Sequence, residues 1–274
     1  MTLSTTDCEA IRMLVRQRSG IVLEEEKTYL VETRLSALAR REGFASLEGL
    51  LAKFHAPLSN GLHEKVVEAM TTNETSFFRD MQPFEALRQA VLPEVLERRA
   101  AQRQLFIWCG AASSGQEPYS LAILLREHFP ALANWHVRIV ATDLSLAMLE
   151  RARRGLYSQV EINRGLSASL LVKYFNRSGL EWQLKDDIRS MVEYRQMNLI
   201  ENWPTMTPPD IVMLRNVLIY FDVETKRTIL GKVRRLMRPD GYLFLGGAET
   251  TMNLDDAFER VPFDRSGCYR LRRS

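Results

Sequence analysis

The stretch that decides the fold is Leu105-Phe-Ile-Trp-Cys109, which runs into the turn Gly110-Ala-Ala-Ser-Ser-Gly115. Five consecutive apolar residues predict a short buried strand, and the Gly/Ala/Ser-rich turn predicts a tight connection to a following helix. Because glycine has no Cβ, the backbone of such a turn can approach a ligand closely. The spacing Gly110-x-x-x-x-Gly115 matches neither the dinucleotide fingerprint nor a P-loop, so a turn that binds nothing remains the alternative.

The region beyond this turn repeats the same pattern of strands and helices. Apolar runs at 137–142, 210–214 and 242–245 predict three more buried strands, with helical segments between them. Alternation of this kind indicates a parallel sheet with right-handed crossovers, which is a Rossmann-like α/β fold. Two further strands, at 180–184 and 191–195, are separated by a polar turn. They predict a small antiparallel insertion over about 156–197.

The first third of the chain reads as helices throughout, with apolar residues at helical spacing and glycines as stops. We therefore expect two domains. The first is an all-α N-terminal domain over 1–90. The second is an α/β domain over 91–274 that carries the insertion.

Composition and charge exclude several classes of protein. The 274 residues include 37 Lys and Arg against 34 Asp and Glu, a net charge of +3, and 46% are hydrophobic. These are ordinary globular values, and the small excess without a concentrated basic run argues against a nucleic-acid partner. No apolar run approaches the roughly 20 residues of a membrane span, and the first residues lack the basic and apolar regions of a signal peptide. Three widely spaced cysteines argue against disulfides and a cysteine metal site, so we expect a cytoplasmic protein without metal.

Asp143 ends the second predicted strand, beside the glycine turn at the carboxyl edge of the sheet. Its two carboxylate oxygens can accept both hydroxyls of a ribose. The alternative is an N-cap for the helix that begins near Leu144-Ser145. A ribose-binding carboxylate beside a turn without diphosphate donors favours S-adenosylmethionine over a nicotinamide dinucleotide.

Three longer motifs resemble the CheR family of chemotaxis receptor methyltransferases. They are Thr72-Asn-Glu-Thr-Ser-Phe-Phe-Arg79, Ala111-Ala-Ser-Ser-Gly-Gln-Glu-Pro-Tyr-Ser120 and Leu214-Arg-Asn-Val-Leu-Ile-Tyr-Phe-Asp222. The resemblance covers nearly the whole chain. It implies a methyltransferase that uses S-adenosylmethionine to methylate glutamate side chains on the helical cytoplasmic region of chemoreceptors, with S-adenosylhomocysteine as product.

The resemblance also implies roles for individual residues. Cofactor contacts are carried over to Asn73, Thr75, Arg79, Glu117, Asp143, Asn198, Leu199, Asn216 and Val217. Arg79 and Tyr220 match residues near the transferred methyl group, which makes them the predicted catalytic residues. Taken singly, Asn73 could be a helix cap, Arg79 a solvated charge and Tyr220 a core residue.

The segment after the third strand departs from the Asn-Pro-Pro-Tyr motif of many amine methyltransferases. The chain has Arg215-Asn216-Val217-Leu218 there. A carboxylate offers no proton to such acceptors, so this departure suits a glutamate substrate. Because a glutamate with a pKa of about 4.3 is ionised at neutral pH, no general base is required, and Arg79 and Tyr220 are expected to orient the reactants.

Lys27, Arg34 and Arg41 recur every seven residues and are expected on one face of a helix. This basic stripe is a predicted docking surface for an acidic receptor helix, and the alternative is an ordinary solvated face. The inserted strands offer another docking edge, which in this family only some members use. An RNA methyltransferase and a non-catalytic cofactor-sensing scaffold remain the alternative functions.

Overall fold

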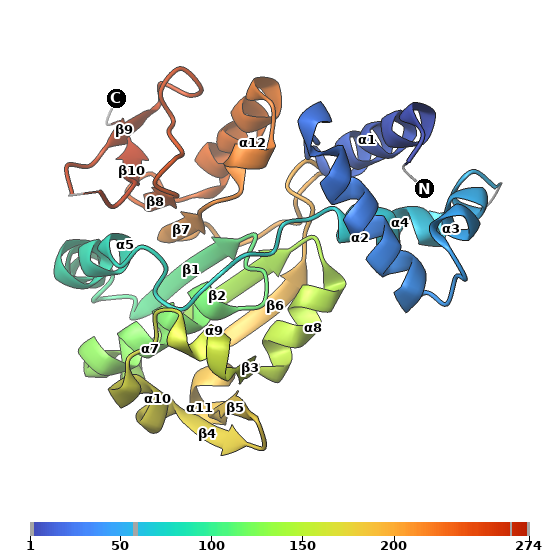
Figure 1. Ribbon diagram of the computed structural model, residues 1–274. Helices are drawn as coiled ribbons and strands as arrows, with labels where there is room; N and C mark the ends of the chain where they lie inside the picture. Colours follow the sequence, from blue (N-terminus) through green and yellow to red (C-terminus); the bar gives the residue numbers. More distant parts are fainter. Residues whose placement is uncertain (1–2, 57–59, 264, 273–274) are drawn as a thin grey trace. The chain divides into compact units, whose positions relative to one another are not determined.

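The computed structural model describes residues 3–56, 60–263 and 265–272 (Figure 1). They fall into two compact units. Unit 1 comprises Met1–Thr72 and Tyr220–Thr225, and unit 2 comprises Asn73–Ile219 and Lys226–Ser274. The division therefore lies near residue 72, whereas the sequence suggested one near residue 90.

Unit 1 is helical, as predicted. Its helices are α1 (Thr5–Ser19), α2 (Thr28–Arg41), α3 (Leu47–Phe54) and α4 (Asn60–Ala69), with a 3-10 turn η1 (Glu25–Lys27) before α2. Each helix contributes apolar side chains at a spacing of three or four residues, and these form a small core. The fully buried members include Ile11, Val15, Leu35, Leu50 and Val66.

A short segment from late in the chain completes unit 1. Residues Tyr220–Thr225 return to it. Phe221 forms an isolated antiparallel bridge with Ile21. The Val22 N–H donates to the Tyr220 carbonyl at 2.9 Å. The sequence pattern did not predict this return, because it depends on pairing across about 200 residues.

Unit 2 is built on a seven-stranded sheet with the order β6-β2-β1-β7-β8-β10-β9. The first five strands in that order are parallel, and β10 is antiparallel to both of its neighbours. The strands are β1 (Gln104–Gly110), β2 (His136–Asp143), β6 (Val192–Gln196), β7 (Ile211–Leu214), β8 (Tyr242–Leu245), β9 (Phe258–Arg260) and β10 (Cys268–Leu271). The four strands predicted from apolar runs are present, and the fold class is confirmed.

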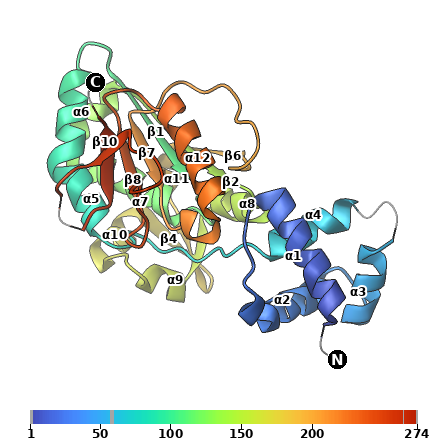
Figure 2. The same cartoon turned by 90° about the horizontal axis from the view of Figure 1, so that it is seen from above.

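Helices cover both faces of this sheet (Figures 1 and 2). Helices α7 and α8 follow β1 and β2 and lie on one face, whereas α12 connects β7 to β8 on the other, as right-handed crossovers in opposite directions require. The remaining helical segments are short. The helices and turns that follow α4 in the chain are α5 (Gln82–Ala86), η2 (Leu87–Val91), α6 (Leu92–Arg98), α7 (Gln116–His128), η3 (Pro130–Asn134), α8 (Leu146–Arg154), α9 (Gln159–Asn163), α10 (Ala168–Tyr174), α11 (Asp186–Arg189), η4 (Leu218–Tyr220) and α12 (Val223–Leu236).

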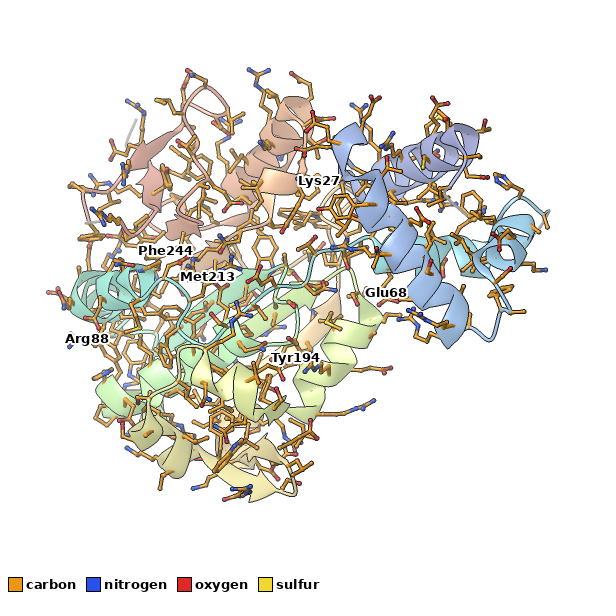
Figure 3. The ribbon with its side chains drawn as sticks, viewed as in Figure 1. Lys27, Glu68, Arg88, Tyr194, Met213 and Phe244 are labelled. Atoms are coloured by element: carbon orange, nitrogen blue, oxygen red, sulfur yellow. The ribbon has the colours of Figure 1, made fainter. Side chains whose placement is uncertain are left out.

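The core of unit 2 lies along the central strands. Met213 of β7 and Phe244 of β8 are register partners, are both fully buried, and lie side by side in Figure 3. Trp108 and Tyr119 are also fully buried, and each has a partner for its polar hydrogen. A buried sheet of this kind holds the carboxyl ends of its strands in fixed positions.

The predicted insertion is present in part. Strands β3 (Leu156–Ser158), β5 (Glu181–Leu184) and β4 (Phe175–Ser178) form a three-stranded antiparallel sheet in the order β3-β5-β4. The assignment of 191–195 to this insertion is wrong, because β6 pairs in parallel with β2 in the main sheet. Its alternating burial reflects its place at the edge of that sheet, where one face stays exposed.

Candidate functional site

The carboxyl ends of the parallel strands meet at one edge of the sheet, and the predicted cofactor residues follow them. In an open α/β sheet, ligands bind at this edge. The strand order β6-β2-β1-β7 brings together segments that are up to about 100 residues apart in sequence. The residues that follow these strands are Asn198 and Leu199 after β6, Asp143 at the end of β2, Glu117 beyond β1, and Asn216 and Val217 after β7.

The loop after β1, Ala111–Gly115, is termed the β1 loop. Ala111 and Ser113 adopt left-handed backbone conformations, with φ of 57° and 50°. Packing explains why residues 110 and 115 are glycines. A Cβ on Gly110 would lie 2.8 Å from Leu214 Cδ1, and one on Gly115 would lie 2.5 Å from the Tyr194 hydroxyl. The glycines therefore serve the contact of strand, loop and helix.

The backbone N–H groups of the β1 loop are used inside the protein. The Ala112 N–H donates to the Thr142 carbonyl at 2.9 Å, and the Gly115 N–H donates to the Ala112 carbonyl at 3.0 Å. The Ser113 N–H donates to the Asp143 carboxylate at 2.8 Å. Three of the five backbone donors of the loop are therefore directed to acceptors inside the protein and are not available to a diphosphate.

Asp143 is buried and accepts two backbone N–H groups. The second donor is Ser145 N–H, at 2.9 Å from Oδ1. Asp143 is not the N-cap of α8, because Ser145 holds that position and its hydroxyl accepts the Met148 N–H. The N-cap alternative for Asp143 is therefore wrong, because its carboxylate holds the backbone of the β1 loop and of the turn before α8 instead.

The loop after β6 lies beside Asp143. The Met197 N–H donates to the Asp143 carbonyl at 3.0 Å, which places Asn198 and Leu199 next to the end of β2. The Lys232 ammonium of α12 donates to the carbonyls of Leu199, Ile200 and Glu201 at 3.0, 2.9 and 2.7 Å. Partial burial lowers the pKa of Lys232. Three carbonyls satisfy the three donors of an ammonium, so this lysine fixes the loop.

The first sequence motif crosses the same edge. The Ser113 hydroxyl donates to the Asn73 carbonyl at 2.8 Å, and the Phe78 N–H donates to the Ser120 hydroxyl at 2.9 Å. Arg79 donates to the Glu74 carbonyl at 2.8 Å, which holds its side chain against its own segment. Thr75 is half-buried between them. The motif is thus attached to the β1 loop and to α7.

Arg215 joins several of these parts and was missed as a site residue. Its side chain is 1% exposed, and its guanidinium lies 2.8 Å from Glu117 and 2.9 Å from Asp80. It also donates to the Arg79 carbonyl at 2.8 Å. Burial raises the pKa of Glu117, and the charge of Arg215 opposes that rise. The available signal was an arginine directly after an apolar strand, where a buried cation requires partners.

Glu249 is the second residue that sequence reasoning missed. It follows β8 by four residues and is buried, and its carboxylate accepts backbone N–H groups of the segment after β7. An isolated glutamate in a polar segment carries no pattern that would distinguish it from a surface residue. Its contacts are described in detail below.

Tyr220 belongs to unit 1, whereas Arg79 belongs to unit 2. The Tyr220 carbonyl accepts the Val22 N–H, and two residues later Asp222 pairs with Arg16 at 2.7 Å. The helical unit therefore holds the backbone on which Tyr220 is carried.

The predicted basic stripe is only partly an exposed helix face. Lys27 precedes α2 and pairs with Glu24 at 2.7 Å. Arg34 is half-buried and donates to the Met70 carbonyl at 2.6 Å and to the Thr72 hydroxyl at 3.0 Å. Burial lowers the pKa of Arg34. Arg41 is 59% exposed and lies 3.6 Å from the Glu42 carboxylate.

Among the described residues, no group of three or more metal-ligating side chains could hold a metal ion. The helices in this part of the chain also include none that is long and apolar enough to span a bilayer. The cysteines Cys8, Cys109 and Cys268 are free and buried. Burial raises the pKa of Cys109 well above its ordinary range, so it behaves as an apolar core residue.

Comparison with known proteins gives matches over nearly the whole chain. The family model described as CheR methyltransferase, SAM binding domain, matches residues 73–266, and the model of the CheR all-alpha domain matches residues 6–71. The chain is 43% identical over 276 residues to chemotaxis protein methyltransferase 1 of Pseudomonas aeruginosa, which covers 99% of this chain and 100% of that protein. It is 42% identical to chemotaxis protein methyltransferase Cher2 of Pseudomonas putida, over 95% of this chain and 96% of that protein. A chemotaxis protein methyltransferase of Vibrio parahaemolyticus is 39% identical, over 99% of both chains.

Proposed function

Because the chain belongs to the CheR methyltransferase family, whose S-adenosylmethionine-binding domain it carries, we propose that it methylates glutamate side chains of chemotaxis receptors. The products are glutamyl methyl esters and S-adenosylhomocysteine. The observation that carries this proposal is the carboxyl edge of the sheet. There the buried carboxylate of Asp143 accepts the N–H groups of Ser113 and Ser145, and three of the five N–H groups of the β1 loop are bonded inside the protein.

The residues at this edge fit a nucleoside without a diphosphate. We assign Asp143 to the ribose hydroxyls and Glu117, near the N-terminus of α7, to the amino-acid part of the cofactor, where a carboxylate can pair with an ammonium. The other proposed cofactor contacts are Asn73, Thr75, Arg79, Asn198, Leu199, Asn216 and Val217. The bound cofactor supplies a methyl group on a positively charged sulfur.

The transfer itself moves no proton. A carboxylate oxygen of the substrate forms a bond to the methyl carbon, the bond from that carbon to sulfur breaks, and sulfur keeps the electron pair. Because a glutamate is ionised at neutral pH, a general base is unnecessary. What the protein supplies is alignment and removal of the water shell around a weak nucleophile. We assign this orienting role to Arg79 and Tyr220.

The segment after β7 supports a carboxylate substrate over an amine. Arg215 is directed into the protein, toward Glu117 and Asp80. The backbone N–H groups of Asn216 and Val217 are engaged by Glu249. The segment lacks the Asn-Pro-Pro-Tyr motif, whose polar groups would accept hydrogen bonds from a target nitrogen.

The test is a labelling experiment. The protein is incubated with methyl-labelled S-adenosylmethionine, receptor-bearing membranes and bulk RNA, and the labelled product is treated with base. A glutamyl methyl ester releases methanol in base, whereas N-methyl and RNA base methyl groups are stable. Base-stable label, label on RNA, or no label on receptors would contradict the proposal.

The proposed partner is the acidic helical region of a receptor in the cytoplasm, and the proposed contact is the stripe of Lys27, Arg34 and Arg41. Since Arg34 also closes the C-terminal end of α4, charge reversal at Arg41 is the cleaner test. Arg41→Glu is expected to slow receptor methylation severalfold at low salt and to weaken its salt dependence. Activity and salt dependence equal to those of the unmodified protein would remove Arg41 from the docking surface.

A further inference from the structure

The Glu249 carboxylate accepts several backbone N–H groups of the segment that follows β7. Glu249 Oε2 accepts the N–H groups of Asn216 at 2.8 Å and Gly246 at 2.6 Å. Its Oε1 accepts those of Val217 at 2.8 Å and Ile219 at 3.3 Å. The residue is 8% exposed. The segment Arg215–Ile219 is termed the β7 loop, and three of its five N–H groups point to this one side chain.

The Glu249 carboxylate lies so close to Gly246 that a side chain at residue 246 would collide with it. A Cβ on Gly246 would lie 2.6 Å from Asn216 Nδ2, 2.7 Å from Glu249 Oε2 and 2.8 Å from Asn216 N. These distances are shorter than any a Cβ atom can tolerate without displacing its neighbours. Gly246 is therefore required by the close approach of the carboxylate to the β7 loop.

The β7 loop needs such a support. Asn216 has φ of 58°, a left-handed conformation that costs free energy for a residue with a side chain. Backbone N–H groups that point inward also need an acceptor, because a buried donor without a partner is unfavourable. A charged acceptor forms the strongest hydrogen bonds to such donors.

We propose that Glu249 is a positioning residue for methyl transfer, which holds the β7 loop so that Asn216 and Val217 lie in place to bind the cofactor. This inference depends on the proposed function, since it assumes that Asn216 and Val217 contact the cofactor. Glu249 itself acts through the loop and touches neither reactant.

The discriminating variant is Glu249→Gln. A carboxamide has nearly the same shape, but it keeps one acceptor oxygen and places an NH2 group against backbone donors. At least two N–H groups then lose their acceptor. Glu249→Asp keeps the charge with a shorter side chain, and it is the conservative variant expected to restore part of the function.

Asp210 provides a matched control at the other end of β7. It is 2% exposed, accepts the Phe106 N–H at 2.9 Å and pairs with Arg99 at 2.7 Å. Asp210→Asn also removes a buried charge that accepts a backbone N–H, and it lies far from the carboxyl edge of the sheet. A purely structural role for Glu249 would make the two variants behave alike.

The measurement is the dissociation constant of S-adenosylhomocysteine by titration calorimetry, together with kcat, KM and urea unfolding for each variant. Glu249→Gln is expected to raise the dissociation constant about tenfold or more, with Glu249→Asp between it and the unmodified protein. Asp210→Asn is expected to lower stability while leaving that constant within about twofold. Equal dissociation constants in Glu249→Gln and the unmodified protein would overturn the inference. So would an equal weakening of S-adenosylhomocysteine binding in Glu249→Gln and Asp210→Asn. Absence of binding by the unmodified protein would instead contradict the proposed function.

Discussion

The β1 loop and the β7 loop are each held by a buried carboxylate, but only the carboxylate that holds the β1 loop could be recognised in the sequence. Each follows a buried parallel strand and contains a non-glycine residue with positive φ. Each is held by a buried carboxylate that follows the neighbouring strand. Asp143, from the end of β2, holds the β1 loop, and Glu249, from beyond β8, holds the β7 loop.

The two carboxylates differ in the role that we propose for them. Asp143 accepts the N–H groups of Ser113 and Ser145, whereas Glu249 accepts those of Asn216, Val217, Ile219 and Gly246. Four donors saturate the carboxylate of Glu249. We propose that Asp143 both holds a loop and binds the cofactor, whereas Glu249 only holds a loop.

The largest expected effect comes from removing Arg215, which connects the β7 loop to Glu117 of α7. Arg215→Met should cost about 3–5 kcal/mol of unfolding free energy, because it leaves the carboxylate of Glu117 buried without its cation. The pKa of Glu117, already raised by burial, should rise further. The folded state then binds the extra proton, so the variant should lose stability as pH rises above the ordinary glutamate range, by the sign of proton linkage.

Urea unfolding between pH 5 and 8 measures this effect. Arg99→Met is the control, because Arg99 pairs with Asp210 at 2.7 Å and Asp240 at 2.6 Å away from Glu117. It should destabilise the protein and leave cofactor binding intact. A stability that rises with pH in Arg215→Met would contradict the role given to Glu117.

A somewhat smaller effect is expected at Asp143, and it tests whether this carboxylate both holds and binds. Asp143→Ala should weaken S-adenosylhomocysteine binding by roughly 2–3 kcal/mol, about 30- to 150-fold, since hydrogen bonds to a charged acceptor are lost. An analogue that lacks the ribose 2′-hydroxyl should bind the unmodified protein more weakly. In Asp143→Ala, the analogue and S-adenosylhomocysteine should bind with equal affinity.

Glu249→Gln is the contrasting variant for this pair of measurements. Removal of the 2′-hydroxyl should weaken binding to Glu249→Gln as much as to the unmodified protein, because Glu249 does not contact the ribose in the proposed arrangement. A coupling between the 2′-hydroxyl and Glu249 as large as that with Asp143 would remove the distinction between the two carboxylates.

Tyr220 extends the comparison to the residue that follows the β7 loop. Tyr220→Phe is expected to lower kcat about tenfold, or about 1.4 kcal/mol, with little change in cofactor affinity, because the hydroxyl orients the reactants. Single-turnover kinetics and calorimetry measure the two quantities. Tyr29→Phe, at a tyrosine that is 67% exposed on α2, is the matched control. Unchanged turnover in Tyr220→Phe would withdraw its assignment.

The smallest effect is expected at Asp222, which anchors the chain just beyond Tyr220. Hydrogen bonds from Thr225 and Arg16 lower its pKa from 3.8 to about 2. A depressed carboxyl pKa stabilises the folded state at neutral pH, and this stability is lost as pH falls from about 4 to about 2.

Asp222→Asn should therefore lose about 1 kcal/mol at pH 7, after allowance for the solvent screening of a partly exposed pair, and almost nothing at pH 2. Urea unfolding at the two pH values measures the difference. Asp187→Asn, at an exposed carboxylate of α11, should show no such change. An equal loss at both pH values would mean that Asp222 stabilises the protein without its charge.

Much of the architecture could be predicted from local patterns. Short apolar runs identified four parallel strands, and the glycines at 110 and 115 identified the β1 loop. Asp143 could be found because it follows a strand directly, so its position at the carboxyl edge depends only on the existence of that strand. The roles proposed for the other cofactor residues depend on the resemblance of three motifs to a family.

The parts that could not be predicted depend on which distant segments meet. β6 alternates buried and exposed residues as an antiparallel strand would, and only its pairing with β2 reveals that it is an edge strand of the main sheet. Glu249 lies in a segment without periodicity, and its four hydrogen bonds exist only when β7 and β8 are adjacent. Arg34 has the spacing of a surface stripe, but its guanidinium is directed to the end of α4.

The sequence by itself determined the fold class, the family and the residues that follow each strand, because strands, turns and helix starts are set by neighbours within a few residues. The tertiary structure decided which carboxylate holds which loop, that Tyr220 is carried by the helical unit, and that Arg215 connects the loop after β7 to α7. The physical reason is that buried charges must find partners, and those partners are brought close only by packing of the complete chain.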